Sequence, residues 1–234
     1  MSNMKIGGLQ KLTLLDFPGK VACTVFTVGC NFRCPFCHNA PLVTHCGTTT
    51  TMPEEEFFSF LKKRQGILDG VAITGGEPTL MSGLYDFIGK IKDMGFLVKL
   101  DTNGTSPELL KTLIDNKMID YAAMDIKNSK EKYAVTSGLS ENYDLSKIYE
   151  SADILMQGKI DFEFRTTLVS PYHTEDDMES IGRWLSGDEK FYLQNFVDSG
   201  DLVGTGVRGM SYDDATKLLS KLQPFITNAQ LRGY

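Results

Sequence analysis

The strongest constraint on the fold is a regular alternation of short apolar runs with amphipathic segments. Strands buried on both faces of a parallel sheet carry consecutive apolar residues rather than strict alternation. Six runs have this pattern: Val21–Thr27, Gly70–Thr74, Phe96–Asp101, Tyr121–Lys127, Phe162–Val169 and Phe191–Phe196. A segment with helical spacing follows each of them: Glu54–Gln65, Gly83–Met94, Pro107–Asn116, Leu145–Met156, Thr174–Ser186 and Asp213–Lys221. Six strand–helix units predict an α/β fold whose parallel sheet is either open or curled into a partial barrel.

Both ends of the chain lie outside this repeat. Ile6–Lys20 predicts an N-terminal extended arm with a turn at Asp16-Phe17-Pro18-Gly19. Phe225–Leu231 predicts an additional terminal strand. No linker rich in Pro, Gly or Ser and no internal repeat interrupts the pattern, so we expect residues 1–234 to form a single domain.

Composition and charge exclude several classes of protein. Apolar residues make up 41% of the chain and charged residues 23%, which is typical of a globular protein with a real core. The net charge is −6 and there is no basic run, so a nucleic-acid partner is not expected. No apolar stretch reaches membrane-spanning length and no signal peptide is visible, so we expect no membrane partner and a reducing, cytoplasmic location.

Three cysteines in one short polar loop are the main chemical signal. Cys30, Cys34 and Cys37 have C-x3-C-x2-C spacing within the loop 28–47. A cube-shaped iron–sulfur cluster normally takes four thiolates, so three would leave one iron open to a small molecule. Arg33 and the backbone N–H groups of such a loop are expected to favour thiolate over thiol. Phe36 is expected to shield a cluster from water.

Other interpretations of the five cysteines stay open at this point. Zinc could take the three thiolates and the adjacent His38. A disulfide framework is disfavoured because the number of cysteines is odd. Cys46 could supply a fourth cluster ligand, whereas Cys23 lies within an apolar run and is expected in the core.

Polar residues occur where the predicted strands end, and parallel α/β folds bind their ligands at that edge. Tyr172 and His173 follow the fifth strand and are expected at the mouth of such a site, His173 as a surface residue. The convergence of loops predicts one binding site, whose candidate residues are Gly75, Gly76, Glu77, Pro78, Asp101, Asn103, Asp125, Lys127, Arg165 and Gln194.

The Gly-Gly-Glu-Pro turn suits an amino-acid-like ligand. Gly75 and Gly76 carry no Cβ and let the backbone approach a ligand closely. Glu77 could accept a hydrogen bond from an amine, and Pro78 stiffens the turn. The spacing matches neither a phosphate loop nor a dinucleotide fingerprint.

Asp101 and Asp125 are expected side by side at the ends of neighbouring strands. Two such carboxylates repel each other unless a cation or a donor lies between them. Lys127 could supply that charge or bind the carboxylate of a ligand. A buried structural ion pair and a bound metal cation are both open alternatives.

Taken together, the cysteine loop and Gly75-Gly76-Glu77-Pro78 resemble the radical S-adenosylmethionine superfamily. The resemblance implies a partial (β/α)6 barrel with a [4Fe-4S] cluster on Cys30, Cys34 and Cys37. It implies that S-adenosylmethionine binds the open iron through its amino and carboxylate groups. Reductive cleavage then yields a 5′-deoxyadenosyl radical that abstracts hydrogen, and no further catalytic residue is expected.

A narrower resemblance covers most of the chain. Gly8-Leu9-Gln10-Lys11, Asp16-Phe17-Pro18-Gly19-Lys20 and residues 29–39 are similar to the opening of glycyl-radical-enzyme activating proteins. The most similar type activates anaerobic ribonucleotide reductases. This implies an oxidoreductase with a glycyl-radical enzyme as partner and an electron donor such as flavodoxin or ferredoxin. It also implies a monovalent cation at Asp101 and Asp125.

Two alternatives keep the radical chemistry but change the substrate. One is a pyruvate formate-lyase-type activase. The other is an enzyme acting on a small heterocycle, similar to 7-carboxy-7-deazaguanine synthase. Those synthases tend to carry Cys-Asp-Thr where this chain has Cys37-His38-Asn39.

Overall fold

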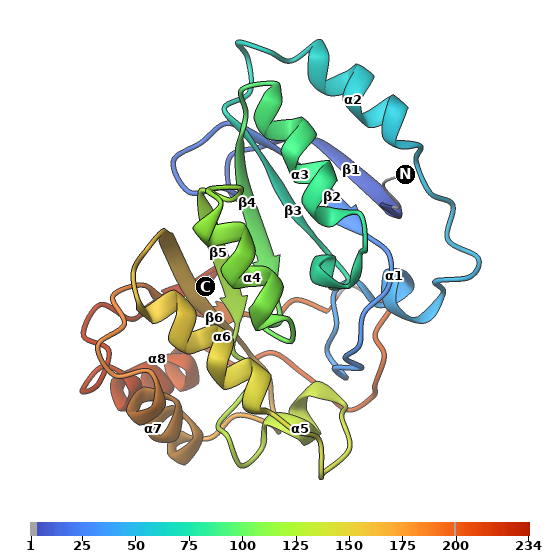
Figure 1. Cartoon of the computed structure of the whole chain (residues 1–234). Coiled ribbons are helices and arrows are strands. Elements are labelled where there is room, and N and C mark those ends of the chain that lie inside the picture. Colours follow the sequence, from blue (N-terminus) through green and yellow to red (C-terminus); the bar gives the residue numbers. More distant parts are fainter. Residues whose placement is uncertain (1–3, 199) are drawn as a thin grey trace.

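A computed structural model describes residues 4–198 and 200–234. Within those residues eight strands form one sheet in the order in which they occur along the chain (Figure 1). Their bounds are β1 Ile6–Thr13, β2 Ala22–Thr27, β3 Gly70–Gly75, β4 Leu97–Thr102, β5 Tyr121–Asp125, β6 Asp161–Leu168, β7 Phe191–Asn195 and β8 Gln230–Arg232.

The sheet is parallel from β2 to β8, and β1 pairs antiparallel with β2 at one edge. In the described part of the chain β1 and β8 are the two edges, so the sheet does not close. The predicted α/β partial barrel of parallel strands is thereby confirmed. The N-terminal arm is extended as expected, and its first part is strand β1 of the sheet.

Six helices correspond to the predicted helical segments: α2 Glu54–Lys62, α3 Leu84–Asp93, α4 Pro107–Asp115, α6 Ser146–Met156, α7 Glu175–Trp184 and α8 Tyr212–Leu222. Local sequence explains where several begin. Pro107 occupies the first turn of α4, where its missing N–H costs nothing. Thr174 and Asp177 form a reciprocal capping box at the start of α7. The apolar faces of the helices are buried, as at Phe87 and Ile91 of α3, and α3, α4 and α6 lie along the outside of the sheet (Figure 1).

Some local structure was not predicted. Short helices occur at α1 Ala40–Thr44, η1 Pro78–Leu80 and α5 Tyr133–Ser137, each too brief to show a helical period. The predicted last strand begins too early, because Phe225 and Ile226 form a turn on Leu222 at the end of α8. Phe225 also packs against Gly182 of α7, so only the final residues of that segment pair with β7.

The register of the sheet gathers the strand ends that carry the polar candidates. Thr27 of β2 pairs with Gly75 of β3, and Asp125 of β5 pairs with Arg165 of β6. Because consecutive strands are parallel neighbours, the loops after β2, β3, β4 and β5 emerge at the same end of the barrel. Every helix in the described part of the chain is too short or too polar to span a lipid bilayer.

Candidate active site

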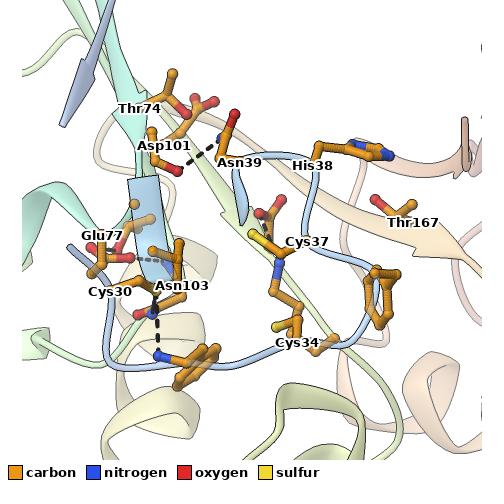
Figure 2. A pocket seen from close by; sticks show the side chains of 18 of the residues that line it. Cys30, Cys34, Cys37, His38, Asn39, Thr74, Glu77, Asp101, Asn103 and Thr167 are labelled. Atoms are coloured by element: carbon orange, nitrogen blue, oxygen red, sulfur yellow. Dashed lines mark hydrogen bonds and ion pairs between the residues drawn. The ribbon is translucent and has the colours of Figure 1, made fainter. Parts of the chain in front are cut away.

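A cavity of about 220 Å³ opens at the carboxyl ends of the strands. All three loop cysteines line it, with residues from β3, β4, β5, β6 and β7 (Figure 2). Pro78, the first residue of η1, does not line the cavity, and neither do Tyr172 and His173, which were expected at its mouth. The predicted residues that the fold brings to its walls are Cys30, Cys34, Phe36, Cys37, Gly75, Gly76, Glu77, Asp101, Asn103, Asp125, Lys127, Arg165 and Gln194.

Hydrogen bonds to neighbouring elements hold the cysteine loop. The Arg33 N–H donates to Ser137 O of α5 at 2.9 Å. The Arg33 guanidinium donates to the carbonyl oxygens of Cys30 and Phe32, each at 2.7 Å. Asn39 Nδ2 donates to Gly75 O at 2.9 Å, which ties the end of the loop to β3. Arg33 therefore braces the backbone of the loop.

The Cys30 sulfur receives two N–H groups. The backbone N of Phe32 lies 3.3 Å from it and Asn103 Nδ2 lies 3.9 Å from it. Asn103 is itself fixed by a 2.8 Å bond to Asn31 Oδ1. Donors of this kind stabilise a sulfur that carries negative charge, which suits a cluster ligand.

The expectation that the loop itself favours thiolates is wrong. Burial raises the pKa of Cys34 to about 12 and that of Cys30 to about 11, and it also raises the pKa of Cys37. Desolvation of the charged form outweighs the nearby N–H groups and cations. Ionisation of these thiols at neutral pH therefore depends on a bound metal, as is usual for thiolate ligands.

Cys30, Cys34 and Cys37 all line the same cavity, as the three ligands of one cluster would have to. Among residues 4–198 and 200–234, no three His, Cys, Asp or Glu side chains are grouped as ligands of a single metal ion. His38 stacks on Phe196 with ring centroids 5.3 Å apart. Cys46 is exposed, bonds to carbonyl oxygens of α1 and does not line the cavity. Cys23 is fully buried in β2, as expected.

Gly75 ends β3 against Thr27 of β2, and Gly76 packs very closely against Gly29 at the start of the cysteine loop. A Cβ on Gly76 would lie 1.9 Å from Gly29 O. Gly75 has φ +108°, a conformation that strongly favours glycine. The N–H of Glu77 donates to Gly29 O at 2.8 Å. The β3 loop and the cysteine loop are therefore one packed unit.

The Glu77 carboxylate is buried, and four donors surround it. Oε1 accepts from Thr79 N at 3.1 Å, Thr79 Oγ1 at 2.6 Å and Thr102 Oγ1 at 2.8 Å. Oε2 accepts from Asn103 N at 2.6 Å. Burial raises the pKa of Glu77, and these hydrogen bonds partly oppose the shift. Glu77 thus joins the loops after β3 and β4, and its contact with a ligand amine stays a prediction.

Asp101 and Asp125 do lie side by side, and the Arg165 guanidinium sits between them. Arg165 lies 3.1 Å from Asp101 Oδ2 and 2.9 Å from Asp125 Oδ1. Burial would raise the pKa of Asp125, but Arg165 and Lys127 outweigh it and lower the pKa to about 2. The pKa of Asp101 is lowered in the same way by Arg165 and Lys99. Both carboxylates are ionised, and a metal cation at this position stays a prediction.

These groups belong to a larger ionic network inside the barrel. Lys99 pairs with Asp101, Lys127 pairs with Asp125 at 3.1 Å, and Arg232 pairs with Glu163 at 2.9 Å. The connected network of described residues carries one more cation than carboxylates. An anionic group that entered the cavity beside Lys127 would therefore balance its charge.

Several lining residues had no specific sequence signal. Thr74, Thr102 and Thr167 reach the cavity only because each lies at the end of a strand. His173 was expected at the surface, and that was wrong: it is buried and its Nε2 lies 2.8 Å from Lys127 O. Its ring holds the β5 loop and does not line the cavity.

Comparison with known proteins decides the family. The model of the radical SAM superfamily matches residues 24–185, from β2 through α7. The chain belongs to the radical SAM superfamily. Its members use a [4Fe-4S] cluster and S-adenosylmethionine, and the three cysteines and the Gly-Gly-Glu turn face the cavity where both would bind.

Curated relatives of this radical SAM enzyme include glycyl-radical activating proteins. A Methanocaldococcus jannaschii protein, provisionally named a glycyl-radical enzyme activating enzyme, is 34% identical over 194 residues, which cover 82% of this chain and 79% of the relative. The 7-carboxy-7-deazaguanine synthase of Bacillus subtilis is 27% identical, covering 77% and 82% of the two chains. A radical SAM methyltransferase from Sphaerobacter thermophilus superposes with a TM-score of 0.73 at 16% identity, over 94% of this chain and 68% of that one, and shows the fold alone.

Proposed function

We propose that this radical SAM enzyme activates a glycyl-radical enzyme. It would reductively cleave S-adenosylmethionine and remove a hydrogen atom from one glycine Cα of the partner. The 34% identity to the M. jannaschii protein, over most of both chains, is the observation that carries the proposal. The resemblance of residues 29–39 to activators of anaerobic ribonucleotide reductases supports that enzyme as the partner.

Each wall of the cavity has a part in this function. Cys30, Cys34 and Cys37 would hold the cluster. When bound, the cluster and S-adenosylmethionine supply the 5′-deoxyadenosyl radical that abstracts the hydrogen. Phe36 is 5% exposed and would keep water from the cluster, which influences its potential.

Lys127 and Arg165 would receive the carboxylate of S-adenosylmethionine. Both face the cavity, and both are cations of a network that has a surplus positive charge. Gly75 and Gly76 would let the ligand's amino group approach the backbone, while Asp101, Asp125, Asn103 and Gln194 complete the pocket around it. A monovalent cation at Asp101 and Asp125 would have to share this space with Arg165.

The protein's contribution would be binding and orientation. The reactive chemistry belongs to the cofactor, so no acid–base pair is required. Bringing the partner's glycine within contact distance of the radical carbon would convert an encounter into a near-unimolecular step, worth effective molarities on the order of 10⁵–10⁸ M. A reducing compartment such as the cytoplasm, with a flavodoxin or ferredoxin as donor, would meet the needs of such a site.

A small-heterocycle substrate is the second candidate. The 27% identity to a 7-carboxy-7-deazaguanine synthase over most of both chains favours it. His38 argues against this candidate, because it follows the third cysteine where those synthases tend to carry Asp. A pyruvate formate-lyase is another candidate partner. A pyruvate formate-lyase-activating enzyme from Listeria monocytogenes is 31% identical to this chain over 134 residues.

The test is formation of a radical on a partner protein. The cluster-loaded enzyme is reduced without air and mixed with S-adenosylmethionine and the anaerobic ribonucleotide reductase of the same cell. A glycine-centred doublet in the EPR spectrum is expected, and Cys34→Ser should abolish it. Absence of the doublet with every glycyl-radical enzyme of that cell, together with turnover of a small heterocycle, would overturn the proposal in favour of the second candidate.

A further inference from the structure

We propose that Arg232, in the last strand, is a positioning residue for Arg165 and acts through Glu163. By holding Glu163, Arg232 leaves the Arg165 guanidinium free to face Asp101, Asp125 and the carboxylate of S-adenosylmethionine. The inference rests on the proposed assignment of Arg165 to the cofactor site.

Glu163 is a buried carboxylate beside Arg165. Both lie on β6, two residues apart, so their side chains share the interior face of the strand. Glu163 is 2% exposed and would be costly to leave without a cation. Arg232 satisfies it with two bonds, of 3.0 and 2.9 Å, and the Tyr121 hydroxyl donates a third at 3.2 Å.

Arg165 lies within reach of two competing carboxylates. Its Nη1 is 3.1 Å from Asp101 Oδ2 and 4.0 Å from Glu163 Oε1. A small rotation of the guanidinium would exchange the first contact for the second. With Arg232 in place, Glu163 already has a bidentate partner, and such pairs are the strongest that a carboxylate forms. Loss of Arg232 would leave Arg165 as the nearest cation to a buried, unpaired charge.

The last strand holds Arg232 firmly in this position. Arg232 pairs in register with Gln194 of β7, which lines the cavity. Its guanidinium lies 3.5 Å from the ring centroid of Tyr192, a cation–π contact. Asn195 Nδ2 donates to Gly233 O at 3.0 Å and fixes the chain just beyond.

Arg232 lies outside the segment that the superfamily model matches, which ends at residue 185. The sequence pattern assigned the terminal strand no chemical role. The structure assigns β8 such a role, because the Arg232 side chain completes the ionic network that ends at the cofactor pocket. β8 is therefore part of the site as well as an edge of the sheet.

A double-mutant cycle on the affinity for S-adenosylmethionine tests this. Equilibrium dialysis of labelled S-adenosylmethionine against the anaerobic, cluster-loaded protein would compare wild type, Arg232→Met, Glu163→Gln and the double variant. We expect Arg232→Met to weaken binding about tenfold, because a charged contact at Arg165 is redirected. Glu163→Gln should change it by less than about threefold, and adding Glu163→Gln to Arg232→Met should restore binding to within about threefold of wild type.

The outcomes distinguish failure of the positioning role of Arg232 from failure of the proposed cofactor site. Wild-type affinity in Arg232→Met, or a double variant as weak as Arg232→Met, would overturn the positioning role. Because Glu163→Gln also relieves the cost of an unpaired buried charge, the melting temperature of each variant is measured beside its affinity, and a loss of affinity that only follows a loss of folded protein would overturn the role as well. Failure of the wild-type holoenzyme to bind S-adenosylmethionine would overturn the assignment of the site as well. If Arg232→Met does not fold, Arg232→Lys keeps one charge but not the bidentate pair. It should weaken binding to an intermediate degree, and unchanged affinity there would overturn the role.

Discussion

Substitution of Gly76 by alanine tests the packing on which the site depends. The new methyl carbon would lie 1.9 Å from Gly29 O, whereas such contacts are essentially never shorter than 3.0 Å. Because the obstructing atom belongs to the backbone, the β3 loop and the cysteine loop must separate by about 1 Å or more. The 2.8 Å hydrogen bond from Glu77 N to Gly29 O would be lost in the process.

The magnitude follows from that displacement. Overpacking costs about 1–3 kcal/mol and a lost buried hydrogen bond about 1 kcal/mol more, so we expect a loss of about 2–4 kcal/mol in stability. A shift of about 1 Å between the cluster loop and the Gly-Gly-Glu turn should lower the rate of S-adenosylmethionine cleavage about 100-fold. Cleavage is measured as 5′-deoxyadenosine formed by the reduced, cluster-loaded enzyme, with iron content determined for each variant.

Gly47→Ala is the matched control. Gly47 lies in the cysteine loop, on the other side of the contact, and a Cβ there would meet nothing within 4 Å. This variant should keep the wild-type rate and melting temperature. If Gly76→Ala cleaved S-adenosylmethionine within about threefold of Gly47→Ala, the inferred contact between the two loops would not control the site.

Two further predictions concern groups outside the pocket. Cys46→Ser should retain the iron content and cleavage rate of wild type, whereas Cys37→Ser should lose both; equal losses would make Cys46 a fourth ligand. Asp188 is buried with Oδ2 unpaired, and desolvation raises its pKa from 3.8 to about 6. Between these values the folded state binds more protons than the unfolded state, so stability should fall by about 2–3 kcal/mol as pH rises from 4 to 6 and then level off. Asp188→Asn should flatten that slope in anaerobic unfolding curves, and an unchanged slope would refute this origin.

Much of the fold could be predicted from local patterns. Apolar runs and helical spacing locate the parallel strands and their helices to within a few residues. A strand buried on both faces carries consecutive apolar residues, whereas a helix buried on one face carries apolar residues at helical spacing. The short α5 has no such signal, and neither does the turn at Phe225 before β8. Both depend on packing partners that are distant in sequence, such as Arg33 for α5 and Gly182 for Phe225.

The candidate site, too, could be predicted from the sequence only in part. Ligand spacing is a local property, so Cys30, Cys34 and Cys37 and the Gly75-Gly76 turn were recognisable from the chain alone. Charge balance and protonation are not local. Only the folded barrel places the Arg165 guanidinium between Asp101 and Asp125, and only burial raises the pKa values of the thiols that their loop was expected to lower.

The sequence by itself therefore determined which superfamily chemistry this chain can support, because that chemistry needs a few residue types at short, fixed spacings. The tertiary structure decided how the charges around it are paired. Coulomb energies and desolvation depend on distances between residues far apart in sequence, such as Glu163 and Arg232 at 2.9 Å, and no local pattern records them.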